Sequence, residues 1–102
     1  MLTFEQKRAI FNSFDLKEKE ISNQRFVYEY PASKQRGKVL ARELYAMTGN
    51  GYVLGKYMSG ETILHNGYEV DSRGWISIMD FSKDELTKVI TIAMESMNGK
   101  SN

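Results

Sequence analysis

Residues 38–58 read KVLARELYAMTGNGYVLGKYM. Two β-prone runs, Val39–Met47 and Tyr52–Met58, flank the segment Thr48-Gly49-Asn50-Gly51. Asn-Gly adopts positive φ at little cost and is typical of tight hairpin turns. We therefore predict a β-hairpin over residues 38–58.

A competing interpretation makes residues 33–47 a helix, with Ser33 as N-cap and Gly49 as C-cap. Gly37 would then lie inside the helix, where glycine costs about 1 kcal/mol relative to alanine. The hairpin has no such cost, and we prefer it.

The clearest strand precedes the hairpin, at Arg25–Tyr30, and Pro31 ends it because proline has no N–H for the ladder. Strand side chains alternate between the two faces, so we expect Phe26, Tyr28 and Tyr30 to point the same way.

Charged residues lie on both sides of this strand. Residues 15–20 are nearly all charged and of mixed sign, which indicates a solvated helix end or a loop. Residues 32–38 contain lysine, arginine and glycine, and we expect an exposed basic loop there.

Two capping boxes mark the starts of helices at opposite ends of the chain. Thr3 and Gln6 predict a helix over residues 4–14, and Ser82 and Glu85 predict one that begins at residue 83 and ends at Asn98-Gly99. Apolar residues of the second helix recur at helical spacing and form a core-facing stripe of Leu86, Val89, Ile90, Ala93, Met94 and Met97.

The segment between hairpin and last helix has three short elements. Residues 59–67 indicate a helical turn closed by Gly67, and residues 71–74 indicate a turn. Trp75–Met79 follows as a short strand, for which Tyr68–Val70 is the expected partner.

Strands joined by short connections favour an antiparallel sheet, and terminal helices can cover one of its faces. We predict an α+β fold: an antiparallel sheet of three to four strands around the central hairpin 38–58, with an N-terminal and a C-terminal helix packed on one face. Residues 1–102 should form a single domain, with residues 98–102 as a frayed tail.

Composition excludes several classes of site. The 102 residues include no cysteine, which excludes a disulfide scaffold, a thiolate metal cluster and a cysteine nucleophile.

The N-terminus has no secretory apolar region, and no apolar run approaches the roughly 20 residues that span a bilayer. We expect a cytoplasmic protein without membrane contact.

The sequence gives little evidence for a catalytic or metal-binding site. His65 is the only histidine, and no nucleophile elbow accompanies it. Asp80, Asp84 and Glu85 do not follow a calcium-loop spacing, and helix capping accounts for the last two. The hairpin glycines do not match a dinucleotide or phosphate loop. We expect no catalytic residue, metal or cofactor, and no enzyme activity.

The net charge of +1 conceals an uneven distribution, because residues 24–58 carry net +4 and residues 59–102 carry net −3. Most tyrosines fall in the basic part. Tyrosines and cations interleaved on strands can bind a partner. The candidate binding surface comprises Lys34, Arg36, Lys38, Arg42, Lys56, Tyr28, Tyr30, Tyr45, Tyr52 and Tyr57.

Two functions fit this surface. The first is a small non-catalytic binding or accessory module that contacts a protein partner, either another protein or a second copy in a homodimer. The second is a nucleic-acid-binding module that uses the basic loop 34–38 and a tyrosine-bearing sheet face. The near-neutral whole-chain charge favours the first.

Overall fold

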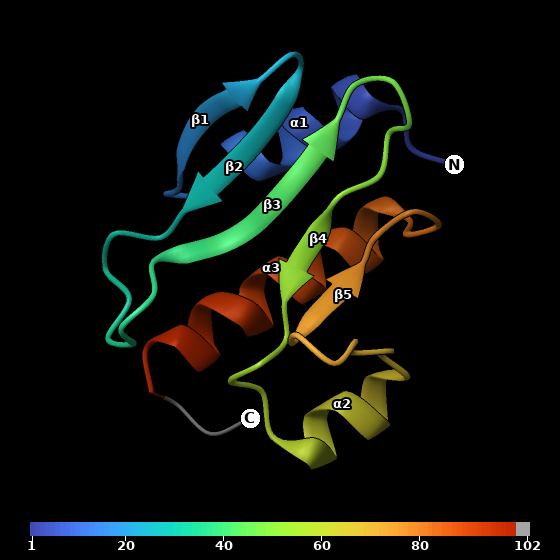
Figure 1. Cartoon of the computed structure of the whole chain (residues 1–102). Helices are drawn as coiled ribbons and strands as arrows, with labels where there is room; N and C mark the ends of the chain where they lie inside the picture. Colours follow the sequence, from blue (N-terminus) through green and yellow to red (C-terminus); the bar gives the residue numbers. More distant parts are fainter. Residues whose placement is uncertain (100–102) are drawn as a thin grey trace.

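Five strands form one antiparallel sheet in which each strand pairs with the next strand along the chain (Figure 1). The computed structural model describes residues 1–99. Its strands are β1 (Lys17–Ser22), β2 (Arg25–Glu29), β3 (Val39–Tyr45), β4 (Tyr52–Leu54) and β5 (Trp75–Ser77). The helices of these residues are α1 (Phe4–Asn12), α2 (Gly60–Asn66) and α3 (Lys83–Met97).

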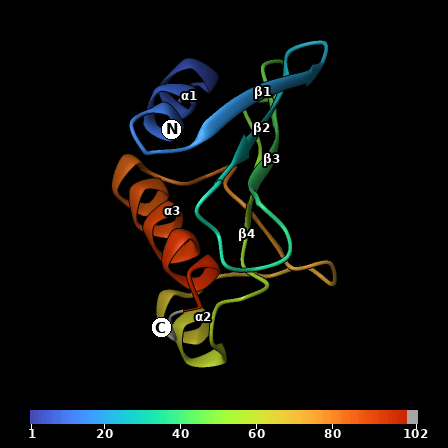
Figure 2. The ribbon, with the colours of Figure 1, turned by 90° about the vertical axis from the view of Figure 1, so that its left-hand side faces the viewer.

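The helices α1 and α3 lie side by side on the same face of the sheet (Figure 2), and α2 lies beyond the end of β4. The core fills the space between these two helices and the inward side chains of the strands. The predicted α+β fold with terminal helices on one face is confirmed, although the sheet has five strands rather than three or four. None of the helices in residues 1–99 combines the length and apolarity needed to traverse a bilayer.

Both predicted capping boxes are present. The Thr3 hydroxyl accepts from the Gln6 amide at 3.1 Å, and the Ser82 hydroxyl accepts from the Glu85 amide at 3.1 Å. The first helix ends at Asn12, two residues before the predicted end. All members of the α3 stripe are buried except Met94, which is half-buried. The predicted frayed tail falls mainly on residues 100–102, which lie outside the described part of the chain.

The prediction of a helix end or loop at residues 15–20 is wrong, because residues 17–22 form the edge strand β1. Its charged sequence lacks the apolar alternation that marks a strand. Pairing with β2 supplies its backbone hydrogen bonds, and mixed charge on an edge strand opposes pairing with other chains.

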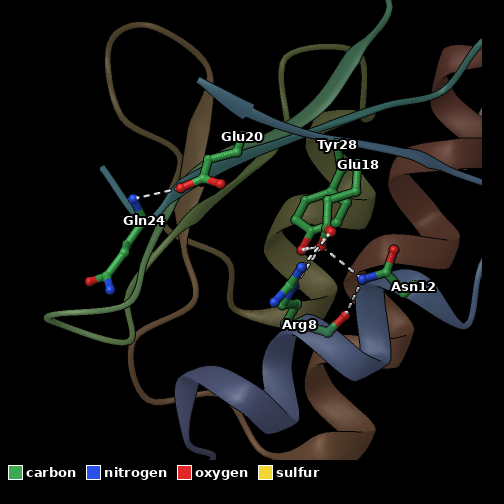
Figure 3. Close-up of polar contacts among 6 residues, drawn as sticks. All are labelled: Arg8, Asn12, Glu18, Glu20, Gln24 and Tyr28. Atoms are coloured by element: carbon green, nitrogen blue, oxygen red, sulfur yellow. Dashed lines mark hydrogen bonds and ion pairs between the residues drawn. The ribbon is translucent and has the colours of Figure 1, made fainter. Parts of the chain in front are cut away.

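Glu18 joins β1 to the helical layer (Figure 3). Its carboxylate accepts hydrogen bonds from Arg8 Nε at 3.0 Å, Arg8 Nη2 at 2.9 Å, Asn12 Nδ2 at 2.8 Å and the Tyr28 hydroxyl at 2.6 Å. The Arg8 hydrogen bonds, followed by those from Tyr28 and Asn12, lower the pKa of Glu18 from 4.5 to about 2, although burial opposes this. Burial and the Glu18 carboxylate raise the pKa of Tyr28.

The predicted hairpin is confirmed as β3 and β4, and the helical alternative for residues 33–47 is excluded. Its turn differs from the prediction. The connection has six residues, 46–51, and the positive φ of 72° falls on Gly49 rather than on Asn-Gly. Gly51 is needed for another reason: a Cβ there would lie 3.1 Å from the Cα of Leu44.

The last strand pairs mainly with the hairpin. Trp75–Ser77 lies antiparallel to Tyr52–Leu54. The expected partner, Tyr68–Val70, contributes only the isolated bridge between Val70 and Ile76. The edge of the hairpin offers more backbone hydrogen bonds than this short segment does, so β5 extends the main sheet.

Lys7 connects α1 to two loops of the sheet. It is 1% exposed, and its ammonium donates to the Gly49 carbonyl at 2.6 Å and the Met79 carbonyl at 3.1 Å. Burial lowers the pKa of Lys7, and the negative charge of Asp80 opposes this change. Lys7 therefore fixes the 46–51 turn and the segment after β5 against the same helix.

We expect Glu18→Gln to destabilise the protein by about 2 kcal/mol at pH 7, which is less than the full pKa shift implies because solvent screens the partly exposed Arg8. Since the folded pKa lies below 4.5, this stabilisation is present above pH 4.5 and is lost as the pH falls toward about 2. Urea unfolding at several pH values measures the difference. Glu29→Gln, which removes the more exposed Lys19 ion pair, should cost less than about 1 kcal/mol.

We expect Lys7→Met to destabilise the protein by about 2–4 kcal/mol, because two carbonyls then lack their donor while the apolar stem is retained. Urea unfolding measures the loss. Lys88→Met, at an exposed position of α3, should change stability by no more than about 0.5 kcal/mol. Equal effects of the two substitutions would contradict the role assigned to Lys7.

Candidate binding surface

The sheet face opposite α1 and α3 is covered by none of the helices in residues 1–99 (Figure 2). We call it the open face. Strand alternation and the register assign it these side chains: Lys19, Ile21, Arg25, Val27, Glu29, Val39, Arg42, Tyr45, Tyr52, Trp75 and Ser77. Glu43 is exposed beside Arg42 on the same face. Phe26 and Tyr28, the alternate residues of β2, point into the core.

A β-bulge in β3 shapes the centre of the open face. The register shifts between Phe26 and Tyr28 because the opposing segment of β3 holds one extra residue, and Glu43 adopts a φ of 56°. Arg42 and Glu43 consequently line the same depressions of the face.

Two arginines of the open face stack on aromatic rings. The Arg25 guanidinium carbon lies 4.1 Å from the centre of the Tyr45 ring, and that of Arg42 lies 4.9 Å from the Trp75 ring. Within residues 1–99, neither arginine has a carboxylate within 4.0 Å. Arg42 Nε is also buried and lacks a hydrogen-bond partner there. No donor of either guanidinium makes a hydrogen bond within residues 1–99, so the terminal Nη donors remain available to a ligand, whereas the buried Arg42 Nε does not.

Two depressions meet at Arg42, Glu43 and Trp75. The more apolar one has a volume of about 340 Å³ and is also lined by Ile21, Val27 and Val39. The other has a volume of about 330 Å³ and is also lined by Tyr52, Asp71, Ser72 and Arg73. Both are shallow hollows of the surface, so they suit side chains of a partner better than an enclosed small molecule.

An Asx turn positions the rim of the second depression. Asp71 Oδ1 accepts from the backbone amides of Arg73 at 2.8 Å and Trp75 at 3.0 Å. The hydrogen bond from Trp75 lowers the pKa of Asp71 most, with further lowering from those of Arg73 and Gly74 and from the charge of Arg42; slight burial opposes it. Asp71 therefore orders the turn that leads into Trp75.

Three of the predicted surface residues, Arg42, Tyr45 and Tyr52, do lie on the open face. Tyr28 and Tyr30 belong instead to the core, where they are 0% and 8% exposed. The Tyr28 ring stacks on Phe11, and the Tyr30 hydroxyl accepts a hydrogen bond from Asn98 at 2.8 Å. Their alternation was predicted, but their side of the sheet is the one that the helices cover.

The basic loop is exposed at Lys34, Arg36 and Lys38, as expected. It is anchored to the end of α3, because the amide of Lys34 donates to the Met97 carbonyl at 2.8 Å and the Ser33 hydroxyl donates to the same carbonyl at 3.3 Å. Cations near a helix C-terminus complement its dipole. Neither depression around Arg42 is lined by a residue of this loop.

Lys56 and Tyr57 lie in the turn after β4, with the Lys56 ammonium 5.7 Å from the Tyr57 ring. The structure thus gathers only part of the predicted set. The predicted set omits Arg25 and Trp75, although strand alternation puts Arg25 on the face opposite Tyr28. Only the pairing of distant strands shows that these residues share a face with Arg42.

His65 is exposed in the last turn of α2 and makes no hydrogen bond or ion pair within residues 1–99. That part of the chain also contains no group of three or more histidine or acidic side chains that could hold a metal ion. Comparison of the chain with protein-family models, curated proteins and solved structures finds no match.

We expect Arg42→Met to leave stability unchanged within about 1 kcal/mol or to increase it slightly. Methionine retains the apolar cover over Trp75 and removes a buried donor without a partner, a group that costs about 1–3 kcal/mol, whereas a cation–π contact contributes only about 0.5–1 kcal/mol. Arg8→Met, at an arginine paired with Glu18, should lose about 1–3 kcal/mol. Thermal and urea unfolding compare the two, and a larger loss at Arg42 would contradict this assignment.

Proposed function

We propose that the protein is a small non-catalytic binding module that contacts another protein through the open face. The observation that carries the proposal is the pair of ring-stacked arginines without carboxylate partners beside an apolar depression. Arginine, tyrosine and tryptophan are the residues that dominate binding energy in protein interfaces.

The surrounding side chains support a protein partner. Ile21 is 55% exposed, and Val27 and Val39 continue the apolar strip across β2 and β3. Charged residues of both signs surround this strip, with Lys19 paired to Glu29 at 3.1 Å. An apolar centre with a polar rim is the usual arrangement of a protein interface.

Nucleic-acid binding is the competing function. Exposed cations of the basic loop and the aromatic residues of the open face favour it individually. The basic loop and the open face together give weaker support for nucleic-acid binding. The loop is anchored at the end of α3, and the open face carries the carboxylates Glu29 and Glu43. A phosphate backbone would meet both carboxylates.

A photo-crosslinking residue at Ser77 tests the proposal. Ser77 is exposed and pairs with Tyr52 on β4, so it reports on the open face without removing an arginine. In cells that naturally make the protein, we expect this position to give a discrete protein adduct that survives nuclease treatment. Arg42→Gln should reduce the amount of this adduct at least about tenfold. Thr91, exposed on α3, is the matched control and should give no such adduct.

Several outcomes of that experiment contradict the proposal. Equal adducts from Ser77 and Thr91 would show that the open face is not selective, and the absence of any Ser77 adduct would remove the protein contact. An adduct that disappears with nuclease would favour nucleic acid. An adduct of twice the chain mass identifies the partner as a second copy, which supports the proposal in its homodimeric form.

A further inference from the structure

The arginines of the open face differ from Arg8 of α1 and Lys19 of β1 in having no acidic partner. Arg8 binds Glu18 through two donors, and Lys19 lies 3.1 Å from Glu29. Arg25 and Arg42 rest on aromatic rings, as Arg8 does on Phe26 at 4.5 Å, but without a carboxylate beside them. A guanidinium that is oriented by a ring and retains its in-plane donors is arranged to bind a carboxylate or a phosphate.

The nearby carboxylates do not fill these positions. Asp71 uses one oxygen to order its turn, and Glu43 makes no ion pair within the described chain. Taken together, the depressions around Arg42 and Arg25 contain three arginines, Arg25, Arg42 and Arg73, and two carboxylates, Glu43 and Asp71. The local charge is thus nearly balanced, and it is the absence of an ion pair at Arg25 and Arg42 that favours an anionic group in the ligand.

The position of Glu43 distinguishes between anionic ligands. This residue lines both depressions around Arg42 and also a smaller one, of about 200 Å³, that contains Arg25. Glu43 thus lies between the two arginines. A continuous phosphate backbone would pass over it, whereas a peptide can present carboxylates only where the arginines lie.

Apolar surface next to Arg42 adds a second requirement on the ligand. The depression lined by Ile21, Val27 and Val39 is continuous with Arg42 and Trp75. Burying a leucine or phenylalanine side chain there is favourable by up to about 1.5–3 kcal/mol. The ligand should therefore carry an apolar side chain close to an acidic one.

We propose that the open face binds an acidic segment of a partner protein, with carboxylates on Arg42 and Arg25 and an apolar side chain in the depression beside Trp75. This inference rests on the proposed function and specifies the chemistry of the partner. Trp75 is the only tryptophan of the sequence, so its fluorescence reports directly on occupation of the site.

The test titrates the purified full chain with the peptide acetyl-Glu-Glu-Leu-Phe-Glu-Glu-amide while Trp75 emission is recorded. We expect a saturable change with this peptide and at least about tenfold weaker binding of the matched peptide in which glutamine replaces every glutamate. Arg42→Gln should weaken binding of the acidic peptide to a similar extent. Arg42→Lys should give an intermediate result, because lysine retains the charge and loses the planar donor pair.

Two controls separate site effects from general ones. Lys88→Gln changes the same net charge at an exposed position of α3 and should leave peptide binding unchanged. Thermal unfolding of each variant verifies that it is folded at the temperature of the titration. A ten-nucleotide oligothymidine should bind more weakly than the acidic peptide at the same salt concentration.

Any of three results would overturn the inference. The first is no saturable response up to 1 mM acidic peptide, a concentration on the order of the weakest specific contacts. The others are equal binding of the glutamine peptide and tighter binding of oligothymidine. The crosslinking result separates this failure from failure of the proposed function. A nuclease-resistant Ser77 adduct without peptide binding would retain the protein contact and reject the acidic segment. Absence of both would reject both.

Discussion

Coverage of one sheet face by both α1 and α3 is the constraint on which the rest of the structure depends (Figure 2). The two helices enclose the inward residues of every strand pair, so the core is complete on that side. The opposite face must then remain stable in water without a covering helix. Its alternation of charged, aromatic and β-branched residues meets this requirement, because stacked rings and arginine stems protect the sheet while charged groups remain hydrated.

The elements that were predicted from sequence are those with local signals. Capping boxes at Thr3 and Ser82 and the stripe of α3 depend only on neighbours within a few turns, and they predicted both helices. The strand β1 has no such signal. It is stabilised by Glu18, whose partners Arg8 and Tyr28 lie ten residues away on either side. A polar contact of this kind leaves no periodicity in the sequence.

The candidate surface was predicted in part for a similar reason. Alternation in β2 correctly separates Tyr28 from Arg25, but it does not say which of the two sides the helices cover. The mistaken choice put Tyr28 and Tyr30 on the surface and left Arg25 out. Trp75 was also omitted, because its contact with Arg42 depends on the order in which β3, β4 and β5 assemble.

Arg8 and Arg42 show how one residue type can serve folding at one position and suit binding at another. Arg8 pairs with the partly buried carboxylate of Glu18, and two of its donors are used in the folded state. Arg42 stacks on Trp75, leaves a buried Nε without a partner, and so contributes less to folding than its contacts alone suggest. Because Nε is buried, only the terminal Nη donors of Arg42 can reach a partner, and a rigid ring beneath the guanidinium reduces the conformational entropy lost on binding. An arginine that is oriented by a ring and has no carboxylate partner therefore contributes little to stability, and it suits the binding role that we propose for the open face.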